Sequence, residues 1–129
     1  FTNKTVNMEN AFQNLSFRYK IWLENSDGEG ILGDGKYRLL KAVEETGSLK
    51  LAIEQLGLSY RKTWDNLERI EQQLGFDLLQ RQRGGAAGGR SGLTDEGKRL
   101  LEIFEAFYRD FDPIFKEHLA LLDNLMHTK

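Results

Sequence analysis

The residue types best suited to recognition chemistry lie in a polar run at 59–66, which reads SYRKTWDN. Arginine and lysine side chains can donate to guanine, asparagine can pair with adenine, and aspartate can accept from cytosine. The run opens on Ser59, a residue type favoured at helix N-caps, and helix N-termini also bind phosphate. We expect this run to contact duplex DNA through Ser59, Tyr60, Arg61, Lys62, Trp64, Asp65 and Asn66.

A second basic stretch, RQRGGAAGGRSGLT at 81–94, surrounds a run of glycines and alanines. Such a run cannot build a core, and ordering glycine costs more backbone entropy than ordering any other residue. A glycine loop does allow the backbone to approach a duplex closely, and arginine suits phosphates or a narrow minor groove. We expect this loop to contact DNA through Arg81, Arg83, Gly84, Gly85, Gly88, Gly89 and Arg90.

Each of these features also has a plainer interpretation. The glycine run could be a disordered hairpin tip, and as a nucleotide-binding loop it lacks the G-x-x-x-x-G-K-[ST] pattern. Arg61 and Lys62 could form a solvated helix start, although cations there oppose the helix dipole. Trp64 could pack in the core instead of facing DNA. Asp65 could form an ion pair with Arg61 or Arg69 along a helix.

Three predicted helices precede the glycine run. Apolar residues at helical spacing predict the first helix over 37–47, and Ser48 can cap a second helix that ends at Gly57. Ser59 can cap a third helix, which ends at Gly75 and carries the polar run in its first turns. The buried stripe of this third helix is expected to consist of Thr63, Leu67, Ile70 and Leu74.

Strand patterns lie on both sides of these helices. Residues 76–82 run from apolar to polar and 91–94 return after the glycine run, so the two segments predict a hairpin. Residues 17–24 alternate with period two and predict another strand, which could pair with about 30–33. Three helices with a tight glycine turn between the second and third, followed by a hairpin, are typical of a winged helix-turn-helix.

The last predicted element is a long helix that begins after Thr94, a suitable N-cap. Pro113 is expected to kink or break it, because proline removes a backbone donor. Its apolar seam is about 25 residues, or about 38 Å, long, which a small winged domain cannot cover. We therefore expect two copies to pair along it. His118 on the seam is expected to be packed or hydrogen-bonded and not to bind metal. The seam consists of Leu100, Phe104, Phe107, Phe111, Ile114, Leu121 and Leu125.

Composition excludes several other classes of protein. The 129 residues contain no cysteine, carry a net charge of −2, and include no apolar run long enough to cross a bilayer. The N-terminus does not resemble a signal peptide, so we expect a cytoplasmic protein without membrane partners. The sequence contains neither a Ser/His/Asp grouping nor metal-ligand spacing, which argues against an enzyme and against a bound metal.

Four motifs together resemble the DNA-binding domain of the molybdate-responsive ModE regulators and, more distantly, the LysR-type winged helix. They are G-S-x-x-x-A at 47–52, G-x-S-Y-[KR]-x-x-W-D at 57–65, the Arg-Gly-Gly wing, and L-T-x-x-G at 93–97. The resemblance covers about residues 36–112. It implies that 59–66 read the major groove, that 84–92 form the wing, and that the helix from residue 95 onward pairs two subunits.

The expected fold is therefore mainly α: a winged helix-turn-helix with a β-hairpin wing and a long C-terminal dimerisation helix. We expect an N-terminal arm at 1–16, the winged domain at 17–94 and the dimerisation helix at 95–129. Full-length ModE regulators carry β-rich molybdate-binding modules, whereas no β-rich segment follows Leu93. We accordingly expect no cofactor in this chain, which leaves room for a separate effector-binding partner.

The expected function is sequence-specific binding of double-stranded DNA by a homodimer that regulates transcription. Two recognition helices related by a two-fold axis predict an inverted-repeat operator. The alternative is a winged-helix protein-interaction module that does not bind DNA. Residues 58–99 hold eight lysines and arginines against six acidic residues, a modest excess that keeps the alternative open.

Overall fold

The computed structural model describes residues 14–81 and 90–127. The chain falls into two units: Lys20–Glu105 form the first, and Phe1–Tyr19 with Ala106–Lys129 form the second. The boundaries between these units lie after residues 19 and 105, whereas the predicted domain boundaries lie after residues 16 and 94. The difference arises because the long C-terminal helix α5 (Asp95–His127) contributes its first turns to Lys20–Glu105 and its remainder to the other unit.

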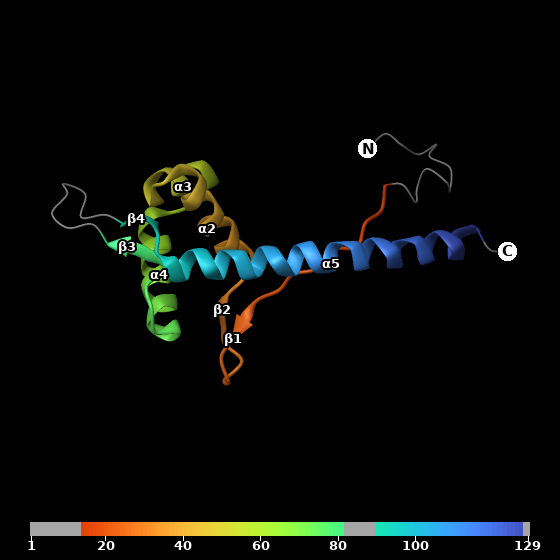
Figure 1. Cartoon of the computed structure of the whole chain (residues 1–129), viewed down its shortest axis with the longest axis horizontal. Coiled ribbons are helices and arrows are strands. Elements are labelled where there is room, and N and C mark those ends of the chain that lie inside the picture. The colour runs from red at the N-terminus through yellow and green to blue at the C-terminus, as the bar shows by residue number, and fades with distance from the viewer. Residues whose placement is uncertain (1–13, 82–89, 128–129) are drawn as a thin grey trace. The chain divides into compact units, whose positions relative to one another are not determined.

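The predicted helices are present in Lys20–Glu105 as α2 (Asp34–Thr46), α3 (Leu49–Leu56) and α4 (Tyr60–Leu74) (Figure 1). Both predicted serine caps are confirmed. The Ser48 hydroxyl accepts from the backbone N–H of Leu51 at 3.2 Å, and the Ser59 hydroxyl accepts from that of Lys62 at 3.3 Å. Each hydroxyl satisfies a backbone donor that the first turn of a helix leaves without an intrahelical partner.

Two antiparallel hairpins accompany the helices. One pairs β1 (Leu23–Glu24) with β2 (Gly30–Leu32), and the other pairs β3 (Leu79–Arg81) with β4 (Arg90–Leu93). The second hairpin confirms the predicted pair of strands. The predicted strand at 17–24 is wrong over most of its length, because only its last two residues pair with β2.

Apolar side chains from α2, α3, α4, β3, β4 and the first turns of α5 share one core. The Phe104 ring lies parallel to the Tyr37 ring, with 6.0 Å between their centroids. Lys41 donates to Glu105 at 2.9 Å, and this hydrogen bond raises the pKa of the lysine. The fully buried larger side chains of the core are Leu39, Leu40, Val43, Leu49, Leu67, Leu78, Leu79 and Leu93.

The first turn of α5 approaches the chain just before β3 very closely at Gly97. The hydroxyl of Thr94, the residue before the helix, accepts from the N–H of Gly97 at 3.0 Å. The N–H of Thr94 in turn donates to the carbonyl oxygen of Leu78 at 2.9 Å. A Cβ atom on Gly97 would collide with that carbonyl oxygen and lie 3.2 Å from its carbon. This close approach explains the glycine of the L-T-x-x-G motif.

Replacing Gly97 with alanine should therefore destabilise the fold by about 1–3 kcal/mol, since the Leu78 carbonyl is held by Thr94 and cannot move away. The measurement is the urea midpoint of unfolding followed by far-UV circular dichroism. The matched control is Gly35→Ala in the first turn of α2, where an added Cβ meets nothing within 4 Å. That substitution should leave stability unchanged or raise it by up to about 1 kcal/mol. Equal midpoints for the two variants would contradict the close packing at Gly97.

In the unit that includes Ala106–Lys129, residues 16–19 lie beside the second part of α5. The Tyr19 ring stacks on Phe115 with 4.1 Å between centroids, and its hydroxyl donates to Asp112 at 2.7 Å. Burial, then the hydrogen bond to Asp112, raises the pKa of Tyr19 to about 12. The alternating pattern at 17–24 therefore packs partly on a helix and does not form a long strand.

The α5 helix continues through Pro113 to His127, so the predicted break at this proline is wrong, while the alternative of a kink stays a prediction. A proline removes a single backbone donor, which the many remaining hydrogen bonds of a long helix withstand. Among the helices that the structure describes, none has the length and apolarity to cross a bilayer.

Candidate nucleic-acid interface

The helix-turn-helix consists of α3, the three residues Gly57–Ser59 and α4. Gly57 has φ of 68°, a left-handed conformation that glycine adopts without strain, and it turns the chain sharply between the two helices. Thr63, Leu67 and Ile70 are buried, which confirms this part of the predicted stripe and orients α4. Leu74, the fourth predicted member, is only half-buried. With this stripe against the core, the opposite face of α4 is left at the surface.

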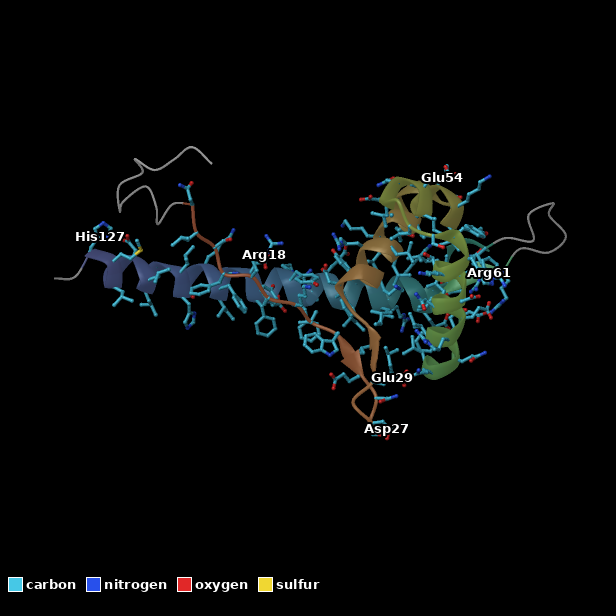
Figure 2. All side chains as sticks on the ribbon, turned by 180° about the vertical axis from the view of Figure 1, so that it is seen from behind. Arg18, Asp27, Glu29, Glu54, Arg61 and His127 are labelled. Atoms are coloured by element: carbon cyan, nitrogen blue, oxygen red, sulfur yellow. The ribbon has the colours of Figure 1, made fainter. Side chains whose placement is uncertain are left out.

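That outer face carries most of the residues predicted to read DNA. The Arg61 side chain is 90% exposed and projects from the first turns of α4 (Figure 2). Its guanidinium lies 3.7 Å from the Asp65 carboxylate, so the predicted ion pair is confirmed. Lys62 is exposed, and Tyr60 is 42% exposed. Ser59, Tyr60, Arg61, Lys62 and Asp65 therefore lie together on one accessible surface.

Trp64 and Asn66 are half-buried on the two sides of this face. Trp64 lies toward the β3–β4 hairpin, with the Arg90 guanidinium 5.5 Å from its ring centroid. Asn66 lies toward the β1–β2 hairpin and accepts from Arg69 at 3.1 Å. Asn66 and Arg69 line a hollow of about 310 Å³ that also includes Trp22. Trp64 therefore packs against the β3–β4 hairpin, an outcome that the sequence alone left open.

Arg90, predicted to contact DNA from the wing, is buried instead. Its side chain is only 1% exposed. One guanidinium nitrogen lies 3.2 Å from Glu68, and another bonds Glu71 and donates to the carbonyl oxygen of Leu79 at 2.9 Å. The predicted phosphate contact is wrong for this residue, because these donors are already held inside the domain.

Arg81 lies opposite Arg90 in the hairpin register and is 49% exposed. Its guanidinium lies 3.0 Å from Glu68, 3.4 Å from Glu71 and 3.4 Å from Asp77. The hydrogen bond with Glu68 raises the pKa of Arg81 further. Three carboxylates therefore compensate its charge, and its predicted contact with DNA remains a prediction. The other predicted wing residues lie outside the described residues: Arg83, Gly84, Gly85, Gly88 and Gly89.

Sequence reasoning missed the two glutamates of α4 that hold these arginines. Glu71 is 5% exposed and accepts from the backbone N–H groups of Leu78 at 2.6 Å and Leu79 at 3.2 Å. A signal was present, since Glu71 follows Leu67 by four residues and therefore falls on the buried stripe. A glutamate on an apolar stripe indicates a buried cation or a set of backbone donors that it must satisfy.

The predicted seam of α5 divides into a buried part and an exposed part. Phe104 is 4% exposed and belongs to the core of Lys20–Glu105, so it leaves the predicted dimerisation set, while Leu100 is half-buried. His118 is exposed, and its Nδ1 lies 2.8 Å from the carbonyl oxygen of Ile114 in the same helix. The exposed seam residues are Phe107 at 43%, Phe111 at 39%, Ile114 at 41%, Leu121 at 60% and Leu125 at 70%.

A helix-turn-helix followed by a hairpin, with a polar helix face at the surface, defines a winged DNA-binding domain. Residues 35–98 match the family of bacterial regulatory helix-turn-helix proteins of the lysR type, and this segment belongs to that family. Within this class the domain is of the ModE type, which confirms the resemblance drawn from the sequence motifs.

The similarity to ModE proteins extends over most of the chain. The chain is 32% identical over 94 residues to the transcriptional regulator ModE of Haemophilus influenzae, a match covering 70% of this chain and 37% of that protein. It is 33% identical over 92 residues to the DNA-binding transcriptional dual regulator ModE of Escherichia coli K12, covering 68% and 35%. It is 36% identical over 75 residues to the molybdenum transport protein ModE of Azotobacter vinelandii, covering 58% and 28%. The chain thus spans between 28% and 37% of the length of these relatives.

Proposed function

We propose that this chain binds double-stranded DNA sequence-specifically as a homodimer and regulates transcription. The observation that carries the proposal is the outer face of α4, where Arg61, Lys62 and Asp65 lie exposed within a lysR-type helix-turn-helix. The residues on this face combine guanidinium, ammonium and carboxylate groups. Such groups discriminate base pairs in the major groove.

In the proposed complex, the first turns of α4 enter the major groove. Recognition helices contact base edges with their N-terminal residues, where Tyr60, Arg61 and Lys62 lie. Ser59 and the backbone at the start of α4 can hold a phosphate, because helix N-termini carry partial positive charge. DNA would exchange the weak exposed pair of Arg61 with Asp65 for contacts to bases or phosphates, since exposed ion pairs contribute little stability.

The exposed seam of α5 supports the homodimer. From Phe107 to Leu125 its residues are spaced four, three, four, three and four apart, with His118 in the series. This alternation places them on one stripe, and helices with such a stripe pair along it. Each apolar side chain on the stripe is at least 39% exposed. A second copy would remove this apolar surface from water.

The test of the proposed function is selection of bound sequences from random duplex DNA, with binding measured at two salt concentrations. We expect binding that weakens with salt and enriches an inverted repeat, because basic side chains displace counterions and a dimer presents two recognition helices. Retention of no duplex even at low salt would overturn the proposal. That result would favour a winged-helix module that binds proteins.

Replacing Arg61 or Lys62 with alanine should weaken binding to the selected duplex. A residue that reads a base should cost about 1–3 kcal/mol on the selected sequence alone, whereas one that contacts phosphate should lower the salt slope by about one on every sequence. Titrations at several salt concentrations, on selected and scrambled duplexes, separate these outcomes. The matched control is Arg109→Ala on α5, an arginine that is 73% exposed and pairs with Asp110. Unchanged affinity and slope for both variants would remove α4 from the proposed interface.

A further inference from the structure

The strongest feature apart from the outer face of α4 is a buried polar network between α4 and the β3–β4 hairpin. Glu71 of α4 accepts from the backbone N–H groups of Leu78 and Leu79, at 2.6 and 3.2 Å. These two residues bring the chain into β3. A single carboxylate therefore holds the start of the hairpin against the recognition helix.

The return strand is held by the same helix. Arg90, the first residue of β4, reaches Glu71 with one guanidinium nitrogen and Glu68 with another, at 3.2 Å in the second case. Its donation to the Leu79 carbonyl at 2.9 Å also joins β4 to β3. In the hairpin register Arg90 pairs with Arg81, which itself lies 3.0 Å from Glu68. Both strands are thus joined to α4 on either side of 82–89.

The contact between Arg90 and Glu71 is buried. The side chains of Arg90 and Glu71 are 1% and 4% exposed. Desolvating two charges largely offsets their attraction, so such a pair contributes less to stability than to fixing one geometry. The Arg90 guanidinium also lies 5.5 Å from the Trp64 ring, whose centroid is 6.0 Å from that of Tyr60. The network therefore extends from the hairpin to the first turns of α4.

We propose that Glu71 and Arg90 are positioning residues, which fix the β3–β4 hairpin relative to α4 so that both elements meet one DNA duplex. The inference rests on the proposed function. In it neither residue touches DNA. The planar arginine fork reaches Glu68 with one nitrogen and reaches Glu71 and the Leu79 carbonyl with the other, whereas lysine has a single nitrogen in place of these two.

The test is Arg90→Lys, which keeps the positive charge and one ion pair but loses the fork. The matched control is Arg38→Lys, which makes the same change in an arginine that is 66% exposed and pairs with Asp34. Binding to the selected duplex is measured against salt at a temperature where both variants are folded by circular dichroism. We expect Arg90→Lys to weaken binding about ten-fold and to lower the salt slope by about one or more, because the hairpin would no longer be held where the phosphate contacts predicted for it can form. Arg38→Lys should match the wild type.

A role in stability alone would leave affinity and salt slope at wild-type values in folded Arg90→Lys, and that result would overturn the inference. If Arg90→Lys does not fold, Glu71→Gln replaces it, since glutamine keeps an acceptor for the Leu78 N–H and removes the charge that holds Arg90. The same loss of salt slope is then expected. A wild type that binds no duplex would overturn the proposed function and this inference together, whereas normal binding by the folded variants overturns the inference alone.

Discussion

Glu71→Ala should lower the free energy of unfolding by about 3–5 kcal/mol, the cost typical of breaking a buried ion pair from one side. The truncation removes the acceptor of the Leu78 and Leu79 N–H groups and leaves the Arg90 guanidinium buried beside a single remaining carboxylate, Glu68. Water cannot take the place of the lost carboxylate beside the Arg90 guanidinium, because the Arg90 side chain is only 1% exposed. The expected result is a large decrease in the urea midpoint, measured by far-UV circular dichroism.

The control for this prediction is Asp34→Ala, which breaks an exposed pair with Arg38 at the start of α2. Exposed pairs contribute about 0–1 kcal/mol, so this variant should unfold close to the wild-type midpoint. Glu71→Ala combined with Arg90→Ala should cost clearly less than the sum of the two single substitutions, since neither charge is then left without its partner. A small loss for Glu71→Ala, equal to that of the control, would show that the carboxylate is not essential to the core.

The helices and most of their ends could be predicted from sequence because their signals are local. The exception is the start of α2, which lies at Asp34 and not at the predicted residue 37, since Gly33 before it has no side chain to cap the helix. Ser48 and Ser59 supply caps that act within three residues, and Gly57 takes a φ of 68° that most residues avoid. The stripe on α4 could be predicted as well, since a period of 3.6 residues places Thr63, Leu67 and Ile70 on one face. The ModE-type resemblance relied on the same stretch of chain.

The errors arose where burial depends on distant partners. Arg90 follows a glycine run and resembles a surface cation, yet Glu68 and Glu71 draw it into the domain. Phe104 fits the spacing of the seam equally well, but the Tyr37 ring of α2 covers it. Alternation before β1 predicts a buried face without saying what buries it, and Tyr19 meets a helix instead of a strand. Neither spacing nor composition encodes such partners.

The same limit applies to the exposed part of the α5 seam, where the partner that we propose is a second copy. Ile114→Glu should convert the dimer to a monomer at micromolar concentration, because a two-fold pair would bury two carboxylates on the apolar stripe. A rise in the dimer dissociation constant of roughly 100-fold or more, about 3 kcal/mol, is expected. Sedimentation equilibrium measures this dissociation constant. Ile114 is 41% exposed, so we expect the variant to stay folded.

Ala120→Glu is the matched control, since it adds the same charge to an exposed position on the opposite face of α5. It should remain dimeric. Binding to the selected inverted repeat should fall for Ile114→Glu toward the affinity for a single half-site, because two linked recognition helices bind more tightly than one. The Ala120→Glu variant should keep the affinity of the wild type. If Ile114→Glu sediments as a dimer and binds the inverted repeat normally, the seam does not join two copies, and the two-fold arrangement proposed for the operator complex must use another surface.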